Sequence, residues 1–78
     1  MAKIHYTETQ WYIRPDESVE TIIVNDTNVV FMHYYNGYYS YFLGLENLMK
    51  YVNNGDTSGR LFCSDNTEDF EKIGELFG

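Results

Sequence analysis

The sequence predicts an α+β fold, in which one antiparallel sheet carries two helices packed on one of its faces. Two observations lead to this prediction. An Asn-Gly pair, Asn36–Gly37, joins two runs rich in aromatic and β-branched residues, and two later segments repeat their apolar residues with helical spacing. The expected order of elements is β-β-β-β-α-β-α, within a single small domain that spans residues 1–78.

The central hairpin has a register that follows from its turn. A two-residue type I′ turn needs positive φ at both positions, which Asn and Gly tolerate. With these two residues as the loop, the expected cross-strand pairs are Tyr35–Tyr38, Tyr34–Tyr39, His33–Ser40, Met32–Tyr41 and Phe31–Phe42. Aromatic residues then fall on both faces, whereas a hairpin with one wet face alternates apolar and polar residues. Either the fold covers both faces, or one face is a contact surface.

The remaining strands are shorter or less regular. The composition of residues 4–13 predicts a strand or an extended arm. Residues 14–18 predict a turn, in which Pro15 biases Arg14 toward an extended conformation. Residues 19–24 predict a strand that ends in a tight loop at residues 25–28. A last short strand is expected over residues 59–63.

Two amphipathic helices are expected in the second half of the chain. The first begins at Leu45 and ends before Gly55, with an apolar stripe formed by Leu45, Leu48, Met49 and Val52. The second follows Asp65, which with Glu68 three residues later resembles a capping box. Its apolar stripe consists of Phe70, Ile73, Leu76 and Phe77.

Cysteine content and the N-terminal residues favour a reducing, cytoplasmic location. Cys63 is the only cysteine, so an internal disulfide is excluded. The first residues lack the apolar segment of a signal peptide, and no apolar run approaches the length of a membrane span. We therefore expect a cytoplasmic protein that does not contact a membrane.

The charge of the chain points to a basic protein as partner. Twelve acidic residues against five basic ones give a formal net charge of -7. Direct binding to nucleic acid requires clustered Lys and Arg, which this sequence lacks. A basic protein surface is electrostatically favourable instead. The alternative is that the acidity only keeps the protein in solution.

No catalytic or metal-binding signature stands out, so we expect a protein that is not an enzyme and uses no cofactor. The soft metal ligands, His5, His33 and Cys63, are spaced unlike any zinc site, and no metal is expected. His33 beside Ser40 suggests a hydrogen bond across the hairpin, because a catalytic serine also needs an orienting group and an oxyanion hole.

Two groups of residues are candidates for protein binding. The first is aromatic, since tyrosine is enriched at interface hot spots, and comprises Tyr34, Tyr35, Tyr38 and Tyr39. The second is acidic, lies on the last helix, and comprises Glu68, Glu71 and Glu75. A further acidic group, consisting of Asp16, Glu17, Glu20 and Asp26, lies in the first half of the chain. The alternatives are ordinary sheet packing for the tyrosines and a solvated helix face for the glutamates.

The expected function is therefore that of a small acidic, non-enzymatic protein-binding module, which inhibits a basic nucleic-acid-handling protein. In size, acidity and lack of catalytic residues the chain resembles small phage or mobile-element inhibitors of host defence, such as anti-CRISPR proteins. The resemblance is one of general character and assigns no family. The alternative function is a structural homo-oligomer or regulatory adaptor, in which the aromatic sheet face pairs with a second copy.

Overall fold

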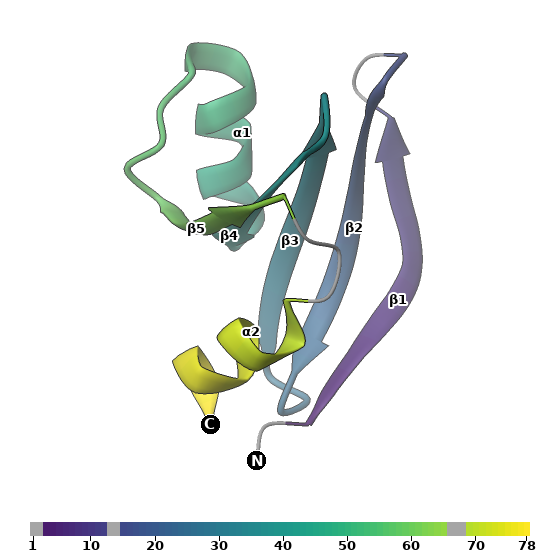
Figure 1. Ribbon diagram of the computed structural model, residues 1–78, viewed down its shortest axis with the longest axis vertical. Helices are drawn as coiled ribbons and strands as arrows, with labels where there is room; N and C mark the ends of the chain where they lie inside the picture. The colour runs from purple at the N-terminus through teal and green to yellow at the C-terminus, as the bar shows by residue number, and fades with distance from the viewer. Residues whose placement is uncertain (1–2, 13–14, 66–68) are drawn as a thin grey trace.

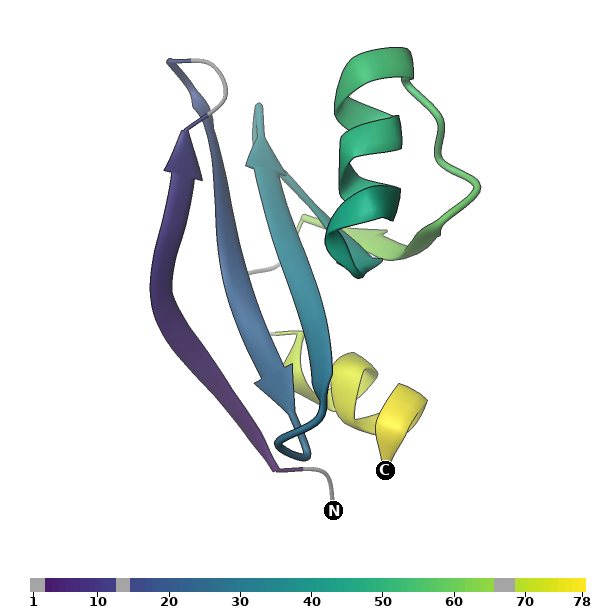
Figure 2. The same cartoon turned by 180° about the vertical axis from the view of Figure 1, so that it is seen from behind.

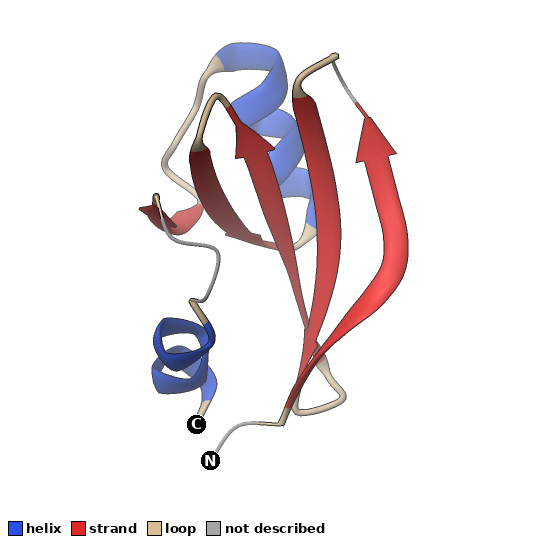
Figure 3. Cartoon of the chain, turned by 45° about the vertical axis from the view of Figure 1, so that its right-hand side comes forward, coloured by secondary structure: helices blue, strands red, loops and turns tan. Residues whose placement is uncertain are grey.

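The computed structural model describes residues 3–12, 15–65 and 69–78. Within them, five strands and two helices follow one another in the predicted order (Figure 1). Their bounds are β1 (Ile4–Tyr12), β2 (Glu17–Val24), β3 (Asn28–Tyr35), β4 (Tyr38–Leu43), α1 (Leu45–Asn54), β5 (Arg60–Ser64) and α2 (Phe70–Phe77). Each strand pairs antiparallel with the next along the chain, so the sheet is a meander with β1 and β5 at its edges (Figure 3). The α+β class is confirmed.

The register of the β3–β4 hairpin is confirmed pair by pair, from Tyr35 opposite Tyr38 to Phe31 opposite Phe42. Its turn has the backbone that the Asn-Gly pair predicts, with φ of 53° at Asn36 and 86° at Gly37. Both angles lie in the left-handed region, which glycine and asparagine tolerate best. The local turn therefore determines which side chains share a face of the sheet.

The two helices lie on opposite faces of the sheet, which corrects the prediction that both cover one face (Figures 1 and 2). On one face, Leu48 of α1 packs in a cluster with Val19, Phe31 and Phe42. On the other face, Ile73 of α2 packs with residues that alternate with these along the strands, namely Ile22, Val24, Val30, Met32 and Tyr41. Since the central strands carry large apolar side chains on both faces, a single layer of helices would leave half of them in water.

A buried hydrogen bond anchors the start of α2 to the sheet. The hydroxyl of Tyr41 on β4 donates to Oδ2 of Asp69 at 2.7 Å, and Asp69 occupies the N-cap position of α2. Burial raises the pKa of Tyr41 well above its usual range, and the hydrogen bond and charge of Asp69 raise it further. Phe62 of β5 stacks on the Tyr41 ring with centroids 4.4 Å apart. The sequence predicted Asp65 as the capping residue, which is wrong, because α2 begins at Phe70 with Asp69 at its N-cap; Glu68, the other member of the predicted capping box, lies outside the described residues.

Neither helix in the described part of the chain combines the length and the apolar character needed to cross a membrane.

The Tyr41–Asp69 bond gives a testable prediction for stability. Tyr41→Phe removes the hydroxyl and leaves a buried carboxylate without this donor, so the unfolding free energy should fall by about 1–3 kcal/mol. Urea unfolding followed by circular dichroism measures the change. The control is Tyr38→Phe, since Tyr38 is exposed and its hydroxyl should contribute little. Equal stability of the two variants would show that the bond does not hold α2.

Candidate protein-binding site

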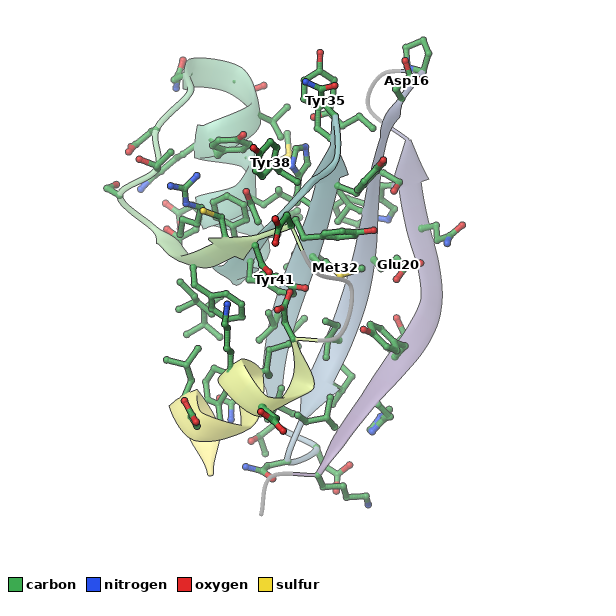
Figure 4. All side chains as sticks on the ribbon, in the orientation of Figure 1. Asp16, Glu20, Met32, Tyr35, Tyr38 and Tyr41 are labelled. Atoms are coloured by element: carbon green, nitrogen blue, oxygen red, sulfur yellow. The ribbon has the colours of Figure 1, made fainter. Side chains whose placement is uncertain are left out.

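Four tyrosines gather at the turn end of the β3–β4 hairpin, and we call them the tyrosine tip: Tyr34, Tyr35, Tyr38 and Tyr39. Tyr35 and Tyr38 form a cross-strand pair on the face of α1 and remain 41% and 62% exposed. Figure 4 shows both in the upper part of the molecule, away from α2. Tyr34 and Tyr39 are half-buried on the opposite face, with ring centroids 5.0 Å apart. The tip therefore presents aromatic rings on both faces of the sheet.

On the face that carries α2, two open hollows lie beside the tip. The first has a volume of about 410 Å³ and is lined by Pro15, Asp16, Glu17, Ser18, Tyr34, Asn36 and Gly37. The second has a volume of about 370 Å³ and is lined by Tyr6, Ser18, Glu20, Met32, Tyr34 and Tyr39. Because Tyr34 and Ser18 line both hollows, we treat them as one feature, the acidic groove. Figure 4 shows Glu20 and Met32 on neighbouring strands of this face.

The electrostatics of the groove come from carboxylates set beside phenol rings. Nε2 of Gln10 donates a hydrogen bond of 2.8 Å to Oε1 of Glu20, which orients that carboxylate at the sheet surface. The pKa of Tyr6 is raised, first by burial and then by the negative charges of Glu20 and Asp69. The phenol of Tyr6 therefore stays neutral at ordinary pH, and among the described residues that line the groove the charged side chains are carboxylates.

A buried hydrogen bond between His33 and Glu17 supports the tip from the α1 side. The Nε2–H of His33 donates a hydrogen bond to Oε1 of Glu17, and the two side chains are only 2% and 0% exposed. The ring of Tyr51 on α1 packs edge-on against His33, with centroids 5.3 Å apart. Glu17 thus begins β2 inside the protein, whereas the sequence predicted it in a turn. The pair ties the start of β2 to β3, just below the tip.

The structure brings together some predicted binding residues and separates others. Tyr34, Tyr35, Tyr38 and Tyr39 share one end of the hairpin, as the predicted register requires. Glu71 and Glu75 are exposed on α2, which lies toward the other end of the sheet (Figure 1). The third predicted glutamate, Glu68, lies outside the described residues.

Sequence reasoning missed most of the groove. Tyr6, Ser18 and Met32 were not candidates, because they reach the groove only through strand pairing between β1, β2 and β3. One signal was present in the acidic group of the first half of the chain, since Asp16 and Glu20 lie four positions apart. That spacing places two residues of an extended chain on the same face of a sheet.

The fold and the groove define a small acidic α+β protein, whose tyrosines and carboxylates meet at one end of its sheet. In the described residues, no cluster of three or more His, Cys, Asp or Glu side chains has the arrangement of a metal site. No protein-family model, curated protein or solved structure matches the chain.

The Glu17–His33 pair predicts how the support of the tip responds to mutation. His33→Leu takes the imidazole away from the buried Glu17 side chain, so the unfolding free energy should fall by about 1–3 kcal/mol. The double variant Glu17→Leu/His33→Leu removes both polar groups and should recover part of this loss. Chemical unfolding of the two variants and the native protein tests this. A double variant less stable than His33→Leu would contradict the expectation.

Proposed function

We propose that this chain is a small acidic protein-binding module without enzymatic activity, which inhibits a basic nucleic-acid-handling protein. The observation that carries the proposal is the position of the exposed tyrosine tip beside the acidic groove. In this proposal the tip supplies the buried anchor of the interface, and the carboxylates face the partner's basic side chains. The inhibitor is of the phage or mobile-element type and acts in the cytoplasm.

The tip has the properties of a binding anchor. Tyrosine combines a large rigid ring with a hydroxyl, so it gains contact area at low entropic cost and is frequent among hot-spot residues. Tyr38 is 62% exposed at the end of a paired hairpin, so much of its ring surface is available to a partner. The backbone beneath it is held by the β3–β4 ladder, so little ordering remains to be done on binding.

The charge of the protein explains why a nucleic-acid-handling protein is the proposed target. Such proteins present clustered Lys and Arg to neutralise phosphates. A net charge of -7 attracts that surface over a distance, and the glutamates of α2 add to the field. In the complex, the carboxylates pair with the partner's basic side chains, which nucleic acid would otherwise contact. Inhibition in this proposal is competitive.

The experiment that tests the function is capture followed by competition. The tagged protein is incubated with lysate of the source cell at low and moderate salt, and bound proteins are identified by mass spectrometry. The expected result is one stoichiometric basic protein that is released as salt rises. The purified partner is then titrated with its nucleic acid, which should displace this chain. A partner that binds both at once would overturn competitive inhibition.

The same capture distinguishes the alternative, a homo-oligomer joined through its aromatic face. In that case only the chain itself is recovered, with a molar mass above that of the monomer by light scattering. Association through aromatic rings should depend weakly on salt, since it involves few charges.

Replacing the exposed tyrosines should weaken binding to the partner and leave the fold intact. Tyr35→Ala/Tyr38→Ala should weaken affinity for the captured partner at least about 30-fold, the effect of losing roughly 2 kcal/mol at a hot spot. The matched control is Leu45→Ala/Met49→Ala, which truncates two similarly exposed apolar residues of α1. Isothermal titration gives the affinities, and thermal unfolding checks the fold. Equal losses in both variants would remove the tip from the interface.

Charge reversal predicts which carboxylates lie in the interface. Asp16→Lys/Glu20→Lys and Glu71→Lys/Glu75→Lys change the net charge equally, so both should slow association at low salt. Only the first pair should also speed dissociation, because those residues line the groove. Surface plasmon resonance measures both rates. Faster dissociation in the Glu71/Glu75 variant alone would place the interface on α2 instead.

A further inference from the structure

We infer that the hollow lined by Tyr6, Glu20, Met32, Tyr34 and Tyr39 takes the guanidinium group of an arginine side chain from the partner protein. We call it the Glu20 hollow. The inference rests on the proposed function and makes it more specific, since it names the group that the acidic groove recognises. Three observations support it. Tyrosine rings line the hollow, a hydrogen bond orients its carboxylate, and the lysines of the chain pair with other carboxylates.

Aromatic rings line the hollow on both sides of its floor. Tyr34 and Tyr39 pack with ring centroids 5.0 Å apart at the β3–β4 side, and Tyr6 stands on β1. Met32 of β3, which is nearly buried, also lines the hollow. A cation over the face of a tyrosine ring is attracted by the quadrupole of the ring. The neutral phenol of Tyr6, whose pKa is raised by burial and by Glu20, keeps this wall from ionising at ordinary pH.

Glu20 adds a carboxylate in a defined orientation. The amide of Gln10 donates a hydrogen bond of 2.8 Å to Oε1 of Glu20, which favours one orientation of the carboxylate before a ligand arrives. Asp16 lies in the adjoining hollow, across Tyr34 and Ser18. Negative charge therefore lies on both sides of Tyr34. A phosphate or another anion would be repelled from such a site, whereas a cation would be attracted.

Each lysine of the chain pairs with a carboxylate that does not line the groove. Lys3 pairs with Asp26 at 3.3 Å, Lys50 with Glu46 at 3.6 Å, and Lys72 with Asp69 at 4.0 Å. The acidic partners of these ion pairs do not line the Glu20 hollow. Among the described ion pairs, Glu20 is thus not matched with a lysine. A cation supplied by a partner protein fits the charge of the hollow.

Arginine fits these features better than lysine does. Its guanidinium group is planar, so it stacks on a tyrosine ring while its edge donates two hydrogen bonds to one carboxylate. The ammonium group of lysine is compact and strongly hydrated, and it cannot make both contacts with the same geometry. Tyrosine rings and a carboxylate line the Glu20 hollow together, which is the combination that favours arginine.

The test is an NMR titration of the ¹⁵N-labelled chain with two capped peptides, tetra-arginine and tetra-lysine, at low salt. Tetra-arginine should shift the backbone resonances of the residues that line the Glu20 hollow. It should also bind about three- to five-fold more tightly than tetra-lysine. Uniform shifts over all acidic residues, or equal affinity for the two peptides, would overturn the inference.

Variants locate the binding more closely. Glu20→Gln should weaken tetra-arginine binding about five-fold, and Tyr34→Leu about three-fold, because each removes one of the two recognition elements. The control Glu46→Gln removes an equal charge from α1 on the opposite face and should change affinity less than about two-fold. The spectrum of each variant reports its fold directly. An equal loss of affinity in Glu20→Gln and Glu46→Gln would show that net charge alone explains the binding.

The outcome separates this inference from the proposed function. If a captured partner loses affinity for the tip variant but binds Glu20→Gln normally, the protein-binding function stands and the arginine site is wrong. If the hollow binds tetra-arginine selectively but the chain inhibits no nucleic-acid-handling protein, the site stands and the proposed function is wrong.

Discussion

Burial of apolar side chains on both faces of the central strands is the constraint on which the rest of this structure depends. The Asn36–Gly37 turn sets a register in which Phe31 and Phe42 point to one face, and Met32 and Tyr41 to the other. Because side chains alternate along a strand, slipping by one residue would exchange these two sets. Each face therefore needs its own cover, and the chain has two helices with which to provide it. α1 and α2 accordingly lie on opposite sides of the sheet.

The two faces are not covered to the same extent, and the acidic groove results from that difference. An α-helix of eight residues such as α2 is only about 12 Å long, whereas a strand of eight residues such as β3 spans about 27 Å. One short helix therefore covers only part of the face against which it packs. Tyr6, Met32, Tyr34 and Tyr39 belong to that face and line the open hollow, and Met32 is also part of the core cluster that includes Ile73. The candidate site is the part of an aromatic sheet face that α2 does not reach.

Polar groups that become buried in this fold are paired, one pair within the sheet and one between the sheet and α2. Glu17 meets His33 beneath α1, and Asp69 meets Tyr41 at the start of α2. In the described part of the chain, no buried side-chain nitrogen or oxygen lacks a hydrogen-bond partner. Such pairs contribute little net stability compared with apolar packing, but a wrong arrangement would leave a charge unpaired in the interior. They therefore favour one position of α2 and of the hairpin end that carries the tyrosine tip.

The sequence by itself determined what depends on neighbouring residues. It predicted the element order, the hairpin turn and the tyrosine pairs correctly, because turn geometry and side-chain periodicity are local properties. It did not determine the side on which each helix packs, since either amphipathic helix can cover either apolar face. Nor did it show that Glu17 is buried against His33, or that Tyr6 joins Glu20 and Tyr39 in one hollow. Only the tertiary structure decided these points, because they arise from contacts between residues that are far apart in the chain.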